Sequence, residues 1–230
     1  MSCWGVIPAA GVGRRMLADT PKQYLQVAGM TLLEHSLQAL LADARIRAVS
    51  VVVRAGDGRA SQLGGIAGNP RVSLAIGGDE RSDSVAAGLD DLLALGADVE
   101  DWVLVHDAAR PCLPQASLAA LMEQVLASGR GGILAQPVPD TVKKAFEGQI
   151  AATIDRRDLW LAQTPQMFRL GELRSALSAA RREGRAVTDE ASAMECSGAA
   201  VQLVSSPRRN LKVTTPEDIE LVKFYLQSEN

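Results

Sequence analysis

Histidine and cysteine are scarce in this sequence, and both shortages limit the chemistry it can perform. The only histidines are His35 and His106, and the cysteines Cys3, Cys112 and Cys196 lie far apart with no CxxC pair. This inventory argues against a zinc site and against a mechanism that needs a Ser–His or Cys–His pair. Three widely spaced cysteines also argue against a disulfide framework and favour a reducing compartment, the cytoplasm.

The sequence has no basic excess and no long apolar run, and we expect no signal peptide from its opening residues. The formal net charge is −3, whereas nucleic-acid-binding domains usually carry a strong positive balance, so we expect no nucleic-acid partner. No apolar run approaches the roughly 18 residues that span a bilayer, so we expect no membrane span. The opening residues, MSCWGVIPAAG, lack the basic and apolar regions of a signal peptide.

Aliphatic residues must build the core, because aromatic residues make up only 3% of a chain that is 47% hydrophobic. Short Val- and Ile-rich runs alternate with helical periodicity, which predicts one α/β domain, residues 1–230, with a mostly parallel sheet covered by helices. The expected strands are 3–8, 49–53, 72–76, a run ending at 106–107, and 131–138. The expected helices lie at about 31–42, after 77–84, around 118–125, and from 215. Thr31 and Glu34 form a capping box for the first helix.

Residues 140–158 break this rhythm. They alternate like two strands around Gly148 and carry few large apolar residues, which predicts a β-hairpin arm projecting from the domain. An isolated hairpin is marginal in water, so the arm needs a surface to pack on. A two-fold partner would offer the same surface to both arms, and we therefore expect a homodimer formed through the arm.

The first predicted strand leads into a glycine loop, PAAGVGRRMLADTPKQY. Glycines directly after a strand let backbone N–H groups approach a phosphate closely. The dinucleotide fingerprint fails because Met16 stands where its third glycine belongs, and no G-K-[ST] of a phosphate-binding P-loop follows. The loop is either an ordinary turn or a triphosphate site, and the second reading is favoured by its cations: Arg14, Arg15 and Lys22.

The segment GGDERSDS, residues 77–84, also follows a predicted strand. Its backbone could recognise a nucleotide base. The simpler alternative is that Ser82, Asp83 and Ser84 cap the next helix.

The segment VHDAARP places an acid at the carboxyl end of a central strand, where open α/β sheets bind ligands. Asp107 is a candidate Mg²⁺ ligand or a simple turn residue, and Arg110 is a candidate phosphate ligand. His106 is more readily structural than catalytic, and His35 is an ordinary helix residue. The other candidates are individually weak: Thr141, Arg156, Arg157, Thr164, Thr188 and Lys212. Thr188 is most simply a helix N-cap, and Arg157 is most simply a surface charge.

Together these segments resemble the methylerythritol phosphate cytidylyltransferase family of the non-mevalonate isoprenoid pathway. The motifs occur in the family's order from Pro8 to Thr214, nearly the whole chain: PAAGVGRRM, TPKQY, GGDERSDSV, VHDAARP, DTVK, TIDR, LAQTPQ, TDEAS and NLKVT. The resemblance implies a Rossmann-like nucleotidyltransferase domain and a homodimer in which the arm crosses to the partner subunit.

The resemblance also implies a role for each matching residue. CTP would be bound largely through the backbone of Ala9, Ala10, Gly11, Gly78, Asp79 and Ser84. Arg15 and Lys22 would stabilise the transition state at the triphosphate. Asp107 would contact substrate or Mg²⁺, and the methylerythritol phosphate would be bound by Arg110, Thr141, Thr164 and Thr188. Arg156 and Lys212 would position its phosphate for attack.

The chemistry of such a transfer suits this inventory. A phosphate monoester is already ionised near neutral pH, so its attack on the α-phosphorus of CTP needs no general base. Positioning and positive charge are what the protein must supply. Two alternatives stay open: ribitol phosphate as the acceptor, and an inactive nucleotide-binding regulator on the same fold.

Overall fold

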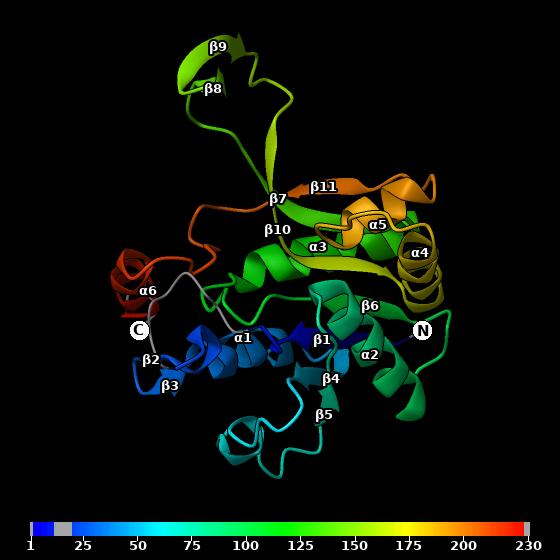
Figure 1. Cartoon of the computed structure of the whole chain (residues 1–230). Helices are drawn as coiled ribbons and strands as arrows, with labels where there is room; N and C mark the ends of the chain where they lie inside the picture. Colours follow the sequence, from blue (N-terminus) through cyan, green and yellow to red (C-terminus); the bar gives the residue numbers. More distant parts are fainter. Residues whose placement is uncertain (1, 12–19, 228–230) are drawn as a thin grey trace.

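A seven-stranded sheet forms the centre of the protein (Figure 1). The computed structural model describes residues 2–11 and 20–227. The strands follow the order β11-β7-β10-β6-β1-β4-β5, and all are parallel except β10, which runs antiparallel to both of its neighbours. Their bounds are β1 Cys3–Pro8, β4 Ile46–Val53, β5 Val72–Ile76, β6 Trp102–Val105, β7 Gly132–Pro137, β10 Trp160–Arg169 and β11 Gln202–Ser205. The predicted mostly parallel α/β sheet is confirmed.

Helices cover both faces of this sheet. Residues of α1 (Leu32–Leu41) and α3 (Gln115–Ser128) share one buried cluster, and residues of α2 (Arg81–Ala94), α4 (Leu170–Arg182) and α5 (Glu190–Cys196) share another. Successive residues of β6 alternate between them: Leu104 belongs to the first cluster, and Val103 and Val105 belong to the second. This alternation is the period of two expected of a strand buried on both faces.

Local signals determine two helix starts. The capping box of α1 is confirmed, because the Glu34 N–H donates to Thr31 Oγ1 (3.2 Å) and the Thr31 N–H donates to Glu34 Oε2 (2.9 Å). The last helix, α6 (Glu217–Gln227), begins two residues after the expected start, where Asp218 Oδ2 accepts from the Thr215 N–H (2.9 Å).

Among the described residues, none of the helices combines the length and apolar character that a membrane crossing requires.

The predicted hairpin is confirmed as a separate two-stranded sheet of β8 (Val142–Phe146) and β9 (Gln149–Ile154). Its turn has positive φ at Glu147 (48°) and Gly148 (78°). Figure 1 shows the hairpin projecting well away from the central sheet. Phe146 is 71% exposed and Ile150 is 68% exposed, so the arm carries apolar side chains that its own chain does not cover.

The beginning of β1 is held by a carboxylate from the loop before β6. Asp101 is 8% exposed and accepts from the Ser2 N–H (2.7 Å), the Trp4 indole N–H (2.9 Å) and the Asp98 N–H (3.1 Å). Burial alone would raise the pKa of Asp101, but these donors outweigh it and lower the pKa below its ordinary value. Asp101 therefore ties β1 to β6 at the end of the sheet opposite the glycine loop.

The substitution Asp101→Asn should lower the free energy of unfolding by about 2 kcal/mol, because an amide N–H₂ would face one of the three donors. Because the folded-state pKa is lowered, the stabilisation is present above the unfolded pKa of Asp and is lost as the pH falls through the folded value. Urea unfolding at pH 7 measures the effect. Asp98→Asn, at an exposed position, is the matched control; equal stability of the two variants would refute this role for Asp101.

Candidate active site

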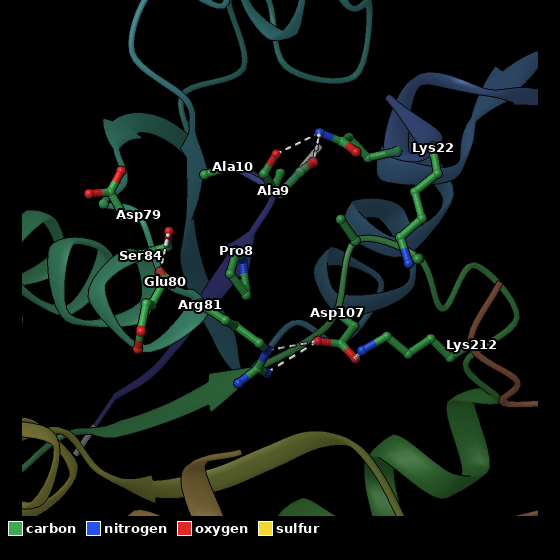
Figure 2. A pocket seen from close by; sticks show the side chains of 15 residues that line it. Pro8, Ala9, Ala10, Lys22, Asp79, Glu80, Arg81, Ser84, Asp107 and Lys212 are labelled. Atoms are coloured by element: carbon green, nitrogen blue, oxygen red, sulfur yellow. Dashed lines mark hydrogen bonds and ion pairs between the residues drawn. The ribbon is translucent and has the colours of Figure 1, made fainter. Parts of the chain in front are cut away.

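A cavity of about 260 Å³ opens at the carboxyl ends of the central strands. The loops that follow β1, β5 and β6 meet there, because these strands run parallel and end at the same edge of the sheet. Of the sequence-predicted site residues, the cavity brings together Ala9, Ala10, Gly11, Lys22, Gly78, Asp79, Ser84, Asp107 and Lys212 (Figure 2). The predicted Arg15, with Gly13 and Arg14, lies outside the described residues.

The beginning of the glycine loop is clamped by Gln23, which the sequence analysis missed. Gln23 is 4% exposed, and its Nε2 donates to the carbonyl oxygens of Ala9 (2.7 Å) and Gly11 (3.1 Å). Lys22 stands next to this clamp on a short 3-10 helix, Lys22–Tyr24, and its Nζ donates to the Val213 carbonyl (3.1 Å). The amide thus fixes the backbone that leads into the loop and places Lys22 beside it.

Two glycines allow the loop after β5 to pack against the start of α2. A Cβ added at Gly77 would lie 2.5 Å from Ser84 Oγ, and one at Gly78 would lie 2.5 Å from Asp83 Cβ. Of the residues expected to cap this helix, Asp83 does so and the two serines do not: Glu80 is the N-cap residue, its N–H donates to Asp83 Oδ2 (3.4 Å) in a capping box, and Ser82 and Ser84 lie inside the helix. Ser84 instead donates its hydroxyl to the Glu80 carbonyl (3.2 Å) within the first turn.

Asp107 is the centre of a cluster of charges (Figure 2). Its Oδ1 accepts from Arg81 Nε (3.2 Å) and Nη2 (3.1 Å), and its Oδ2 accepts from Lys212 Nζ (2.8 Å). Arg110 Nε lies 3.6 Å from Oδ2. Burial alone would raise the pKa of Asp107, but Arg81, Lys212 and Arg110 outweigh it and hold the pKa well below its ordinary value. The carboxylate is therefore ionised throughout the neutral range.

This arrangement does not fit Asp107 as a direct Mg²⁺ ligand. Both carboxylate oxygens already accept from cationic groups, and a divalent ion there would be repelled by three positive side chains. The carboxylates of Asp79 and Glu80 also line the cavity, but Figure 2 shows them pointing away from Asp107. Within the described part of the chain, no three His, Cys, Asp or Glu side chains are grouped to hold a metal ion.

A second, smaller hollow of about 200 Å³ adjoins the first. It is lined by the predicted residues Arg110, Thr164 and Thr188, and it shares Arg81, Asp107 and Lys212 with the larger cavity. The expected capping role of Thr188 is wrong: Asp189 is the N-cap residue of α5, and its Oδ1 accepts from the Ser192 N–H (3.0 Å). The two hollows thus meet at the charged side chains of Arg81, Asp107 and Lys212.

The predicted arm residues lie outside both hollows. Thr141 and Arg156 are exposed, and Arg156 Nη1 donates to the Pro139 carbonyl at the base of the arm. Arg157 pairs with Asp155 on the surface, as the simpler of its two readings expected. The structure therefore does not bring Thr141 or Arg156 to the site of their own chain.

His106 is fully buried and serves as a structural link. Its Nε2–H donates to the Arg110 carbonyl (3.1 Å), so its Nδ1 accepts from the Thr164 hydroxyl (3.0 Å). Thr164 Oγ1 in turn accepts from the Asp107 N–H (3.0 Å). The neutral imidazole satisfies both of its own contacts, and burial, which penalises the charged form, lowers the pKa of His106 to about 4. His35 is structural too, with Nε2 2.7 Å from the Val27 carbonyl.

Sequence reasoning missed Arg81 and Glu190, whose side chains form an ion pair of 2.6 Å. Both residues stand inside segments that it singled out, GGDERSDS and TDEAS. The signal available was a charged residue directly at a helix start within each segment. Their pairing was invisible because 109 positions separate them along the chain.

Comparison with known proteins is consistent with this site. Residues 3–228 match the family "IspD: 2-C-methyl-D-erythritol 4-phosphate cytidylyltransferase". The enzyme of that name from Bordetella parapertussis is 53% identical, over 96% of this chain and 97% of its own. Its counterpart from Escherichia coli O157:H7 is 51% identical, over 96% and 92%.

Solved structures agree with these relatives. A crystal structure of 4-diphosphocytidyl-2C-methyl-D-erythritol synthase matches with a TM-score of 0.85 and 41% identity, over 98% of each chain. The Thermus thermophilus cytidylyltransferase matches with a TM-score of 0.81 and 32% identity, over 99% of this chain and all of the other. The likeness thus extends over the central sheet, the arm and both hollows.

The burial of neutral His106 predicts a pH-dependent stability. The folded-state pKa of His106, about 4, lies below the ordinary value of 6.5. Between pH 6.5 and pH 4, His106 is therefore protonated in the unfolded chain but neutral in the folded chain. The free energy of unfolding should therefore fall as the pH drops from 6.5 to 4, by up to about 3 kcal/mol from this residue. Urea unfolding of wild type and His106→Gln across this range isolates the effect. A difference between the two proteins that stays constant with pH would contradict it.

Proposed function

This chain belongs to the 2-C-methyl-D-erythritol 4-phosphate cytidylyltransferase family, and from that premise we propose how its two hollows divide the reaction between them. The family activity transfers a cytidylyl group from CTP to 2-C-methyl-D-erythritol 4-phosphate and releases pyrophosphate. The observation that carries the assignment is the match over residues 3–228, which includes every segment that lines the two hollows.

The larger cavity is the proposed CTP site. Ala9, Ala10 and Gly11 offer backbone groups at the end of a strand, and the cavity is also lined by Gly78 and Asp79 of the loop after β5 and by Ser84 in the first turn of α2. Backbone contacts of this kind can select one base, because a mismatched base leaves buried polar groups unpaired. Lys22, and Arg15 outside the described residues, would offset the charge that grows on the triphosphate.

The smaller hollow is the proposed acceptor site. Arg110 offers a cation and Thr188 a hydroxyl to a phosphorylated polyol, whereas Thr164 Oγ1, which already donates to His106, can only accept one further hydrogen bond. The ionised Asp107 can accept hydrogen bonds from the polyol hydroxyls. Lys212 stands where the two hollows meet and is placed to bring the acceptor phosphate to the α-phosphorus. A bond forms between that phosphate oxygen and the α-phosphorus while the bond to pyrophosphate breaks. The attacking oxygen is already ionised, so no side chain needs to remove a proton.

We also propose that a divalent cation such as Mg²⁺ takes part, carried into the site by the phosphates of the nucleotide. Because Asp107 is already paired with cations, we expect the ion to bind mainly through the phosphate oxygens. Mg²⁺ commonly binds in this way, through substrate phosphates and few protein ligands. Bound there, it would neutralise part of the triphosphate charge.

Pyrophosphate release measures the proposed activity. Turnover is expected with CTP and 2-C-methyl-D-erythritol 4-phosphate, and it should fall by at least tenfold when UTP replaces CTP or ribitol 5-phosphate replaces the acceptor. Excess EDTA should abolish it. Equal turnover with UTP would refute the proposed base site, equal turnover with ribitol 5-phosphate would favour the alternative acceptor, and full activity in EDTA would remove the divalent cation.

The arm supports a further part of the proposal, a homodimer whose sites are each completed by the partner's arm. Phe146 and Ile150 are largely exposed, and exposed apolar side chains on a two-stranded hairpin call for a covering surface. Arg156 and Thr141 lie at the base of the same arm, outside the hollows of their own chain. A two-fold partner would bring this cation and hydroxyl to the acceptor hollow of the other chain.

Mixed dimers test the shared site. Arg156→Ala and Lys22→Ala should each be nearly inactive alone, because each removes a cation that acts on a phosphate. In a mixed dimer, a shared site would combine both lesions in one hollow and leave the other intact. Co-refolding should then restore up to about a quarter of wild-type activity if chains pair at random. Subunit exchange without recovery would rule out the shared site, and a monomeric mass in solution would rule out the dimer.

The cytoplasm is the proposed compartment. The described residues include all three cysteines, and no disulfide forms: Cys3 and Cys112 are buried thiols, and Cys196 is exposed. Burial raises the pKa of Cys3 to about 11, so that thiol stays protonated. Thiols kept reduced are typical of that compartment.

A further inference from the structure

A buried carboxylate stands behind the charge cluster, outside both hollows. Glu190, in the first turn of α5, is 1% exposed. Its Oε1 accepts from Arg81 Nη1 (2.6 Å), and its Oε2 accepts from Arg81 Nη2 (3.1 Å). Glu190 lines neither hollow, so it is not placed to touch either substrate of the proposed reaction.

Packing alone does not explain a carboxylate at this position. Burial raises the pKa of Glu190, although Arg81 opposes the shift, so the charged form is held at a cost in desolvation. The neighbouring residues Ala191 and Met194 are apolar core residues. Replacing a buried ion pair by apolar side chains of similar volume is often neutral or stabilising, so a role limited to joining α5 to α2 would not require the charge.

The contacts of Arg81 explain why the negative charge of Glu190 matters. One edge of its guanidinium, Nε and Nη2, donates to Asp107 Oδ1, and the other edge donates to Glu190. A guanidinium is planar and its donors form a rigid fork, so it cannot rotate without breaking one of the two pairs. Glu190 therefore fixes the plane of Arg81, and Arg81 in turn fixes the carboxylate of Asp107, whose second oxygen holds Lys212 (2.8 Å).

We propose that Glu190 is a positioning residue for the transfer reaction, acting through Arg81 on Asp107 and Lys212. This inference rests on the proposed function, because it assigns the orientation of the acceptor to a residue that touches neither substrate. Glu190 also sets the local charge: the three cations Arg81, Arg110 and Lys212 face two carboxylates, which leaves one net positive charge for the acceptor phosphate.

The substitution Glu190→Gln keeps the shape of the side chain and removes its charge. The KM for 2-C-methyl-D-erythritol 4-phosphate should rise about tenfold, which corresponds to about 1.4 kcal/mol. The KM for CTP should stay within about twofold, because the backbone groups of the glycine loop and of the loop at Gly78 and Asp79 remain in place, although Arg81, Asp107 and Lys212 line that cavity too. Glu195→Gln, an exposed position on the same helix, is the matched control and should leave both KM values unchanged.

A double-mutant cycle tests whether the effect passes through Arg81. In an Arg81→Gln background, Glu190→Gln should cause no further change in acceptor KM, because the guanidinium that it holds is already absent. If Glu190→Gln does not fold, as judged by circular dichroism, Glu190→Met at similar volume replaces it with the same expectation. Additive effects in the cycle, or equal rises in both KM values, would assign Glu190 a general structural role and overturn the inference.

The outcome separates this inference from the proposed function. Wild-type protein that releases no pyrophosphate from CTP and the acceptor would overturn the proposed function, and the inference would fall with it. Active wild-type protein with a normal acceptor KM in the Glu190→Gln variant would overturn the inference alone.

Discussion

The pairing of Asp107 with cations from three separate segments is the interaction on which the arrangement of both hollows depends. Arg81 comes from the start of α2, Arg110 from the loop after β6, and Lys212 from the chain beyond β11. A buried carboxylate loses its hydration, so it is tolerated only where such partners are held in good geometry. The sheet supplies that geometry: parallel strands end together, and β10, inserted antiparallel, brings Thr164 to the Asp107 N–H.

Features that depend on neighbouring residues could be predicted from the sequence. The strand that leads into the glycine loop, the capping box of α1 and the hairpin arm each follow from a few adjacent residues, and the structure contains all three. The larger cavity also brings together nine of the predicted residues, because the carboxyl ends of parallel strands lie at the same edge of the sheet. Strand β10 was missed because its pairing with β7 breaks register between Ala162 and Gln166, so its hydrophobic pattern does not alternate.

Features that depend on distant residues could not be predicted. The Arg81–Glu190 pair and the Gln23 clamp are side-chain contacts whose partners no local pattern identifies. The errors in the predicted helix caps have a related cause. In GGDERSDS and TDEAS several adjacent residues can cap a helix, and the local sequence does not decide which one does. Asp107 was predicted as a metal ligand because the cations that pair with it, Arg81 and Lys212, come from distant parts of the chain and no local pattern identifies them.

The arm leaves and rejoins the sheet at one point, where the Val138 N–H donates to the Leu159 carbonyl (3.0 Å). Both ends of the excursion are thus held together by the core, and the central strands and helices do not need it to complete their packing. Selection for folding therefore places little constraint on residues 140–158, and selection for function can act on them separately. The core should tolerate insertions, deletions and composition changes there, and what limits them is the proposed contact with a partner together with the positions where the chemistry retains a side chain. The arm is also the natural place to attach a probe without disturbing the core.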